Sequence, residues 1–347
     1  MDTKVPRPRK QHYVTKAYLE GFLMPSKHHL VCYGRGGRLF KRSTEDLACQ
    51  RNYYAVKKDD GNWDDTVEKL IDSSVESPGL PVIQKISSGD TKLSWQDRER
   101  LSLLIAFQEM RTPSARERVR TLSKLLNERV FHEIRSGDPN QTSVKIVGES
   151  GTSVVTLDEM ADAHEVICDD HSMEIHRPLL GSALELSKQY RHMKFMVYYA
   201  TGNDEFITTD TPVIRVFTSG APLGSGINRP DIEIRFPLSR QAFLTLTHDA
   251  ALVEKLKRAS AVKRSQLLDV LPEIRIKYAT SAQVAAFNKG HARHTHQWLF
   301  ASREFEWVVN MLNAPSAAPR IMDLSGPDLI HFQSSVSYDP KIDTEPK

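Results

Sequence analysis

Cysteine is scarce in this sequence, and long apolar runs are missing from it. Its three cysteines, Cys32, Cys49 and Cys168, are too few for a disulfide framework and lack the spacing of zinc ligands. No apolar run near the start resembles a signal peptide, and no segment reaches the length of a transmembrane helix. These absences argue against a disulfide-rich secreted domain and against a membrane protein, so we expect a cytoplasmic protein with no membrane partner.

A net excess of charge is missing as well. The 47 basic and 44 acidic residues give a formal net charge of +3, so the chain as a whole creates no field that requires a nucleic-acid partner. Cations nevertheless gather in two runs, Arg7–Lys16 and Arg98–Arg120. Such runs can contact phosphate groups, although a solvated helix face is the commoner explanation. Local charge therefore keeps a nucleic acid among the expected partners, and the oligomeric state stays open.

The common phosphate-binding and nucleophile motifs do not occur either. The sequence has no Walker-type loop and no Ser elbow of the G-x-S-x-G kind, and its GRGG stretch lies in a predicted hairpin rather than at the start of a helix. Two stretches rich in histidine invite a metal interpretation but match no spacing with a known mechanism. Their residues are His291, His294 and His296 in one stretch, and Asp169, Asp170, His171 and His176 in the other.

What is present is a series of elements typical of an α+β fold. Residues 28–44 alternate around a Gly-rich turn, which predicts a β-hairpin, and NYYAV at 52–56 predicts another short strand. Helical periodicity dominates residues 62–191, and β-rich segments with Gly, Pro and Asn between them dominate residues 192–312. We therefore expect an N-terminal hairpin and a helical block packed on a C-terminal, mostly antiparallel β-rich region.

The boundaries of these elements follow from local signals. Pro78 is expected to interrupt the helix that begins near residue 64, and Ser94 with Asp97 forms a capping-box-like start for the next helix. The strands of the second half are expected at 193–201, 205–210, 212–218, 231–239, 242–248 and 297–302. A hairpin is expected within 138–156, and helices at 158–168, 178–190, 250–259, 281–295 and 304–312. Residues 1–312 should form one domain, and the Pro- and Ser-rich residues 313–347 a loosely ordered tail.

Two polar residues stand out in the helix that contains LSLLIAFQEMRTP. Leu101, Leu104 and Ile105 define an apolar stripe, Gln108 falls in its middle, and Arg111 projects from the same side. A buried amide costs roughly 1–3 kcal/mol unless its hydrogen bonds are met, so Gln108 needs specific partners. Arg111 could clamp an anion with its planar fork, or it could pair with a neighbouring carboxylate and hold two helices together.

Carboxylates are grouped in two further places. Glu68, Asp72 and Glu76 follow at i, i+4 and i+8, so they lie along one side of a helix, where they could bind a divalent ion or form a solvated acidic ridge. Asp210 ends the predicted strand EFITTD just before Pro212, a position suited to catalysis or to an Asx-turn. The sequence leaves both alternatives open in each place.

Several stretches, taken in order, resemble one bacterial family, domain of unknown function 4238, over about residues 11–305. They are QHYVTKAYLEGF, VEKLIDSSVESPGLPVIQKI, IAFQEMRTP, FITTDTPV, FPLS and AAFN. The resemblance implies recurring polar positions at His12, Tyr13, Glu68, Glu76, Gln108, Arg111, Asp210 and Asn288. Two positions depart from the family pattern: Thr15 replaces an expected Pro, which should loosen the start of the first helix, and Lys194 stands near an expected Trp.

Polar positions from distant parts of the chain favour one assembled site, although a structural network of buried polar groups is the alternative. We interpret His12 as a general acid or base, Glu76 and Asp210 as groups that orient it or hold a cation, and Arg111 as a stabiliser of negative charge. Gln11, Tyr13, Gln108 and Asn288 complete the expected substrate-binding set. The metal candidates are Glu68, Glu76 and Asp210, with Mg²⁺ or Mn²⁺ as the expected ion.

This combination suits phosphodiester cleavage better than acyl transfer, because no activated Ser or Cys is evident. The first hypothesis is therefore a nuclease that acts on RNA or DNA, in defence against mobile elements. The second is a non-catalytic module that binds or senses a nucleotide or a peptide with the same residues. A hydrolase for a small phosphorylated metabolite is a third. An open cleft that contains His12 and the carboxylates would favour catalysis, and a closed, fully hydrogen-bonded cluster would favour binding or structure.

Overall fold

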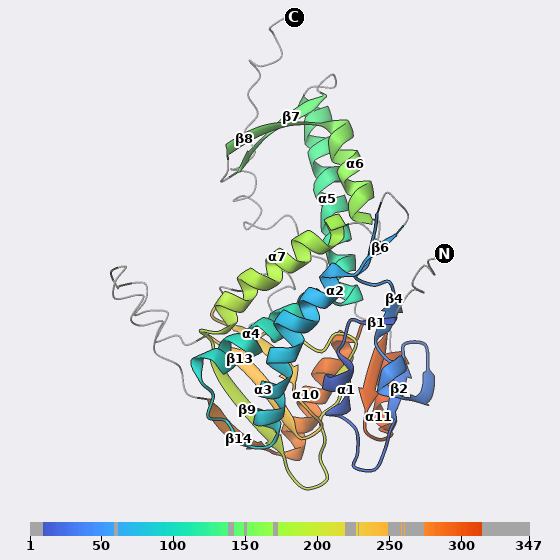
Figure 1. The fold of residues 1–347 in the computed structure, drawn as a ribbon, viewed down its shortest axis with the longest axis vertical. Helices are drawn as coiled ribbons and strands as arrows, with labels where there is room; N and C mark the ends of the chain where they lie inside the picture. Colours follow the sequence, from blue (N-terminus) through green and yellow to red (C-terminus); the bar gives the residue numbers. More distant parts are fainter. Residues whose placement is uncertain are drawn as a thin grey trace, which may run out of the picture.

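The structure of the protein is a computed structural model in which helices cover two β-sheets (Figure 1). It describes residues 10–58, 62–137, 142–148, 151–168, 173–218, 229–248 and 274–313, with single residues at 227, 258 and 260. Among these residues, no helix is both long enough and apolar enough to cross a membrane. The α+β class expected from the sequence is confirmed.

The larger sheet has the strand order β11-β12-β13-β9-β14, and only the pairing of β14 with β9 is parallel. Its strands are β9 (Lys194–Ala200), β11 (Ile214–Phe217), β12 (Ile232–Pro237), β13 (Ala242–Thr247) and β14 (Arg275–Ala279). Alternate residues of β9 face opposite layers, so Phe195 and Val197 enter the main core while Tyr198 packs on Phe287. The sheet therefore lies between α4 (Trp95–Met110) on one face and α10 (Ser281–His294) on the other.

The smaller sheet joins the two ends of the described chain. Its order is β10-β15-β2-β3, all antiparallel, with bounds β2 (Leu30–Gly34), β3 (Arg38–Arg42), β10 (Thr208–Thr209) and β15 (Trp298–Ala301). Strands β2 and β3 are the predicted hairpin, and its turn requires Gly36 and Gly37 because both have a positive φ, 84° and 83°. Helix α11 (Glu306–Asn313) covers one face of this sheet with Val308 and Leu312.

Helix α4 is the central helix of the main core. It begins at the predicted capping box, in which the Ser94 hydroxyl accepts from Asp97 N and the Asp97 carboxylate accepts from Ser94 N, both at 3.0 Å. It packs on α3 (Ser77–Ser87) and on α7 (Met173–Tyr190). Its buried residues Leu101, Leu104 and Ile105 form the predicted apolar stripe and contact the larger sheet through the main core.

Pro78 does not interrupt its helix, contrary to the expectation. Helix α2 (Thr66–Ile71) continues through a π-helical turn, Asp72–Glu76, directly into α3. At the end of this turn the Ser77 amide donates to Asp72 O, five residues back. The wider turn makes room for the Pro78 ring, which has no N–H to donate and would crowd a regular α-helical turn.

A helical pair projects from the rest of the molecule at the top of Figure 1. It consists of α5 (Pro113–Gly137) and α6 (Leu157–Cys168), which the hairpin of β7 (Ser143–Gly148) and β8 (Gly151–Thr156) connects. This hairpin was expected within residues 138–156. Helix α7 then returns to α4; it starts earlier than expected and contains Pro178 in its first half.

Short elements complete the fold near the N-terminus. They are β1 (Lys10–His12), α1 (Lys16–Glu20), a 3-10 turn (Thr44–Asp46), β4 (Cys49–Arg51), β5 (Val56–Lys57) and β6 (Trp63–Asp64). Strand β1 pairs with β4, and β5 pairs with β6.

Two strand predictions are corrected in the same regions of the chain. Residues 52–55 are a turn rather than a strand, with Asn52 at a φ of 54°, because Tyr53 and Tyr54 are buried in succession instead of alternating. The predicted strand 205–210 shortens to β10, because the backbone amides around it bond side chains and other loops. Most of the expected helix 250–259 and the expected tail after Asn313 lie outside the described residues, and the single-domain organisation stays a prediction.

Candidate functional site

Arg111 is the centre of a polar cluster built from three parts of the chain. Its guanidinium donates to the Glu76 carboxylate, to the Thr15 hydroxyl and to the side-chain oxygen of Gln108, which lies 3.2 Å from Arg111 Nε. The Gln108 amide nitrogen in turn donates to the backbone oxygen of Tyr13 at 2.9 Å. We refer to Thr15, Glu76, Gln108 and Arg111 as the Arg111 cluster. It ties the N-terminal segment and the π-helical turn to the end of α4.

The cluster is closed to solvent. The side chains of Arg111 and Glu76 are only 3% and 15% exposed, so the guanidinium depends on protein groups to replace its water. Burial acts to lower the pKa of Arg111, but the Glu76 carboxylate outweighs it and the net effect raises that pKa. Arg111 is therefore a permanent cation whose fork is already used by the protein.

Thr15 has a role that the sequence did not suggest. Its φ of −55° is the value that a proline would adopt, so the start of α1 keeps the geometry expected of the family. The predicted loosening is not seen, since the Thr15 carbonyl accepts the first helical hydrogen bond from Leu19 at 3.1 Å. The hydroxyl that proline lacks accepts a hydrogen bond from Arg111 instead.

Gln11 extends the polar contacts towards α2. Its amide nitrogen donates to Glu68 at 2.7 Å, and its oxygen accepts from the Tyr54 amide at 2.6 Å. The Tyr54 hydroxyl points at the backbone oxygen of His12 at 3.5 Å, and burial raises the pKa of Tyr54 to about 12. Gln11 is buried, and both ends of its amide are satisfied. It therefore anchors β1 to its neighbours.

His12 differs from Gln11, Gln108 and Arg111 in its polar contacts. Its Nε2 is buried and has no hydrogen-bond partner in the described part of the chain. Burial lowers the pKa of His12 below its ordinary value of 6.5. The backbone carbonyls of Thr44 and Glu45 and the Glu76 carboxylate act to raise this pKa, but the effect of burial is larger. The imidazole is consequently neutral at pH 7, and its free nitrogen accepts rather than donates when Nδ1 carries the proton.

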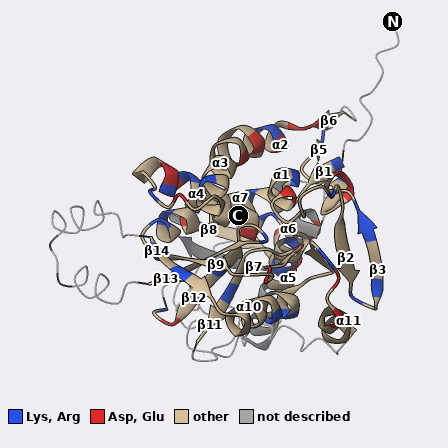
Figure 2. Ribbon diagram, turned by 90° about the horizontal axis from the view of Figure 1, so that it is seen from below, with Lys and Arg blue, Asp and Glu red and all other residues tan. Residues whose placement is uncertain are grey.

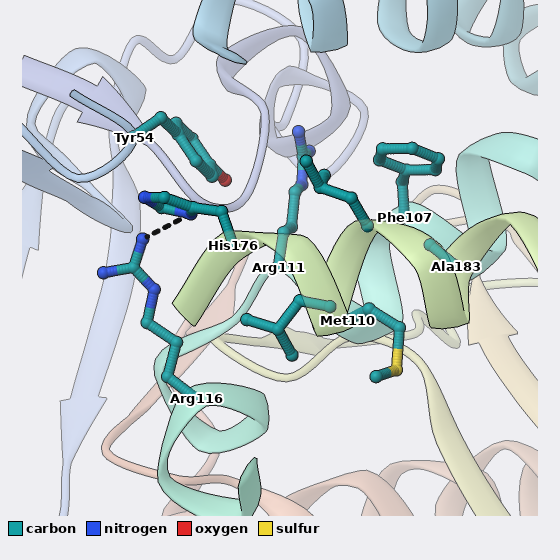
Figure 3. A pocket seen from close by; sticks show the side chains of 9 residues that line it. Tyr54, Phe107, Met110, Arg111, Arg116, His176 and Ala183 are labelled. Atoms are coloured by element: carbon teal, nitrogen blue, oxygen red, sulfur yellow. Dashed lines mark hydrogen bonds between the residues drawn. The ribbon is translucent and has the colours of Figure 1, made fainter. Parts of the chain in front are cut away.

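A small cavity adjoins the cluster between α4, α5 and α7 (Figure 3). Its polar lining comes from Tyr54, Arg111, Arg116 and His176, and the remainder is apolar. Arg116 lies over the Tyr53 ring with its guanidinium carbon 3.6 Å from the ring centroid, and its Nη2 is 3.4 Å from His176 Nδ1. The cavity volume of about 10 Å³ admits roughly one water molecule. It has no room for a nucleotide or a peptide.

Asp210 lies in a separate arrangement at the start of β15. Its carboxylate accepts three backbone N–H groups, from His296 at 3.0 Å, Gln297 at 2.7 Å and Trp298 at 2.8 Å. Burial raises the pKa of Asp210 to about 6, and these three donors counteract the rise. The nearby Tyr13 has its pKa raised by burial and then by Asp210. Asp210 thus fixes a turn that is distant in the sequence. The two roles expected from the sequence, catalysis and a local Asx-turn, did not include this one.

Asn288 and the C-terminal histidines bond backbone as well. Asn288 accepts from Ile207 N at 3.1 Å and donates to Glu205 O at 2.8 Å, so it holds α10 to the chain before β10. His291 is fully buried with Nε2 3.1 Å from Pro212 O, and burial lowers its pKa to about 3. His294 Nδ1 lies 2.8 Å from Gly290 O. These residues are structural in their contacts.

The metal candidates are not brought together. Glu68 contacts Gln11, Glu76 pairs with Arg111, and Asp210 bonds the turn before β15. The described residues contain no group of three or more His, Cys, Asp or Glu side chains placed to share a metal ion. Of the second histidine-rich stretch, His176 faces Arg116, and the aspartates and His171 lie outside the described residues. A divalent cation at Glu68, Glu76 and Asp210 has no geometric support.

Two buried networks escaped the sequence interpretation. Glu109 accepts from Arg215 Nε at 2.6 Å and from the Tyr190 hydroxyl, which links α4 to β11 and α7. Glu205 accepts from Arg240 at 2.9 Å and from Ser302. The available signal was a charged residue inside an apolar pattern, since Glu109 directly follows Gln108 in IAFQEMRT and Arg215 interrupts PVIRVF.

Exposed cations lie on the short strands near the N-terminus, outside the cluster. Lys10 of β1 is directly opposite Arg51 of β4, and both side chains are exposed. Arg42 at the end of β3 is near enough to Lys10 to act on its pKa. We call Lys10, Arg42 and Arg51 the N-terminal cationic surface. It offers a polyanion several donors at once, whereas the cluster beneath offers no free cation.

Residues 10–305 of the chain match the family described as a protein of unknown function, DUF4238. No curated protein and no solved structure matches the chain. The match covers the Arg111 cluster, the larger sheet, the smaller sheet and α10. The chain is therefore a member of the DUF4238 family.

Proposed function

We propose that this protein is a non-catalytic module that binds nucleic acid at the N-terminal cationic surface, and that the Arg111 cluster holds this surface in place. The observation that carries the proposal is the cross-strand pair Lys10 and Arg51. Like charges directly opposite each other destabilise a pair of antiparallel strands. Asp46 already pairs with Lys10, so a bound polyanion would reduce the repulsion chiefly by neutralising Arg51.

The charge distribution around this pair supports the same interpretation. Asp46 binds Lys10, but no described residue forms an ion pair with Arg42 or Arg51. Figure 2 shows Lys and Arg along β3 and beside β1 at the same side of the molecule. Arg42 and Arg51 are therefore free to bind an anion. The chain has a net charge of +3, and solubility alone does not require two unpaired arginines on one surface.

The closed cluster supports binding rather than cleavage. Gln108 and Gln11 fix the backbone of residues 11–13 from both sides, so the segment that follows Lys10 has a defined position. Arg111 has its fork occupied, and Asp210 has both carboxylate oxygens occupied. These groups would have to break existing bonds before they could contact a phosphate. A cytoplasmic location, where nucleic acids are accessible, is part of the proposal.

The test is a binding measurement with a charge-matched control. Fluorescence anisotropy would follow labelled RNA and DNA with wild type, with Arg42→Gln/Arg51→Gln, and with Arg275→Gln/Lys277→Gln on the exposed strand β14. We expect the first double variant to bind more weakly and to reduce the salt-dependence slope by about 2, because each lost phosphate contact lowers it by about 1. The control should bind like wild type. Equal weakening by both variants, or no wild-type binding, would contradict the proposal.

One observation favours the nuclease hypothesis as a second candidate. The unpartnered Nε2 of His12 lies close to Glu76 and Arg111, a combination suited to general base catalysis if the cluster opens. The binding samples, incubated with Mg²⁺, Mn²⁺ or EDTA and resolved on a denaturing gel, distinguish the two functions. Cleavage by wild type that a folded His12→Ala variant lacks would overturn the non-catalytic proposal and would make a role in defence against mobile elements worth testing.

A further inference from the structure

We propose that the ligand of the N-terminal cationic surface is single-stranded nucleic acid, and that Phe40 and Trp298 stack on its bases. This inference rests on the proposed function and goes beyond it by naming the class of nucleic acid and the side chains that select it. It follows from the way in which the smaller sheet presents two aromatic rings beside exposed arginines.

The register of the smaller sheet places these side chains on one face. Along β3, alternation puts Arg38, Phe40 and Arg42 on the same side. Gly34 of β2 lies opposite both Arg38 of β3 and Trp298 of β15, so the indole belongs to this side too. The rings of Phe40 and Trp298 are edge to face, with centroids 5.3 Å apart and an interplanar angle of 72°. The two rings therefore form a single aromatic surface.

Gly34 is required for this arrangement. A Cβ at Gly34 would lie 2.5 Å from a ring carbon of Trp298, so the indole lies directly over the glycine backbone. With any larger residue at position 34 the ring could not lie flat on the sheet. The absence of a side chain at Gly34 thus allows the indole to pack against the backbone of β2.

Both rings are at the margin of the main core and remain partly exposed, while Arg38 and Arg42 on either side of Phe40 are exposed. The Arg42 guanidinium carbon is 5.4 Å from the Phe40 centroid. Arg42 is also one of the three residues of the N-terminal cationic surface. The aromatic surface is therefore continuous with the N-terminal cationic surface.

This combination selects single strands for a chemical reason. Aromatic side chains stack on unpaired bases without regard to sequence, and adjacent cations follow the phosphates. In a duplex the base faces are already stacked on each other, so the aromatic surface gains nothing and only the phosphate contacts remain. A protein that needed only phosphate contacts would have no use for a partly exposed ring between two exposed arginines of β3.

The experiment compares two substitutions on opposite faces of β3. Phe40→Leu removes the ring but keeps an apolar side chain, and Leu39→Gln changes the neighbour that is 47% exposed on the other face. Anisotropy would measure binding to labelled single-stranded RNA and DNA and to a duplex of the same length. Circular dichroism and thermal unfolding would confirm that each variant folds. Trp298→Phe, which keeps a ring over Gly34, serves as a second variant of the aromatic surface.

We expect wild type to prefer single strands, Phe40→Leu to weaken that binding about fivefold or more with duplex binding unchanged, and Leu39→Gln to match wild type. Trp298→Phe should weaken single-strand binding less than Phe40→Leu, because it retains a stacking face. If wild type binds duplex and single strands alike and Phe40→Leu changes neither, this inference is wrong while the proposed function stands. If wild type binds no nucleic acid at all, the proposed function itself is wrong, and this inference with it.

Discussion

Arg111 shows how one buried cation can organise three distant segments. Its contacts with Glu76, Thr15 and Gln108 replace the water that the guanidinium loses on burial. Because Glu76 is the only one of these partners with a formal negative charge, it carries most of the compensation. A catalytic pair and a structural pair differ in their effect on stability. The free energy of unfolding of variants at Glu76 and Arg111 therefore distinguishes the two roles.

Glu76→Leu should destabilise the fold by about 3–5 kcal/mol, because it leaves a buried guanidinium without its counter-ion. The double variant Glu76→Leu/Arg111→Met should recover a large part of that loss, since the uncompensated charge is gone. Urea unfolding of wild type, both single variants and the double variant gives the coupling energy. Glu185→Gln, which breaks the exposed pair with Lys188, should change stability by less than about 1 kcal/mol. A Glu76→Leu effect as small as this control would contradict the interpretation.

At the residue scale, the sequence indicated which groups would be buried better than which groups they would contact. Gln108 and Arg111 were predictable because they fall on the apolar side of α4, where burial follows from periodicity. The partners of Asp210 were not, because they are backbone amides of residues 296–298, and any sequence can supply a backbone amide. Asn288 likewise bonds backbone groups, of Ile207 and Glu205, that no sequence pattern identifies. The predicted polar positions therefore belong to several separate networks and not to one site.

At the scale of elements, the contact between α3 and α4 depends on Gly79. A Cβ at this position would lie 2.8 Å from Leu104 Cβ and 3.3 Å from Arg100 O, so the two helices approach too closely for a larger residue. The π-helical turn just before α3 places Glu76 at the beginning of this contact. Close helix packing and the position of the Glu76 carboxylate are thus consequences of the same short segment.

Gly79→Ala should destabilise the protein by about 1–3 kcal/mol, because the added methyl group forces α3 and α4 apart. Gly181→Ala is the matched control: it is also inside a helix, but nothing lies within 4 Å of its added Cβ. That substitution should be stabilising by about 0.5–1 kcal/mol, since alanine has the higher helix propensity. Thermal unfolding of the two variants measures the difference. Stabilisation by Gly79→Ala would show that the helices have room to separate.

Sequence patterns predicted most elements because hydrophobic periodicity, capping and turn residues are local. They failed at Pro78, where the helix continues because the π-helical turn before it makes room for the proline ring. They also failed at residues 52–55, where two buried tyrosines in succession looked like a strand. The first failure comes from a rare local geometry and the second from burial, and hydrophobic periodicity reports neither.

At the scale of the whole molecule, the first and last described segments depend on each other. Strand β2 pairs with β15, and the main core combines residues of α1, α4 and the larger sheet. Helical periodicity correctly separated a helical half from a β-rich half along the chain, but it could not show that the N-terminal hairpin belongs to a sheet with C-terminal strands. Pairing partners that are more than 250 residues apart leave no trace in a local pattern.

This interdependence predicts one cooperative unfolding transition. Removing residues after 191 would leave β2 without β15 and would expose the face of α4 that packs on the larger sheet, so the fragment 1–191 should not unfold cooperatively. For the full chain, the calorimetric and van't Hoff enthalpies of unfolding should agree, and tryptophan fluorescence should report the same midpoint as far-UV circular dichroism. Two resolved transitions, or a cooperative transition in the isolated fragment, would show that the helical and β-rich halves are separate domains. The smaller sheet would then span both domains, because β2 and β3 precede the helical half and β15 follows it.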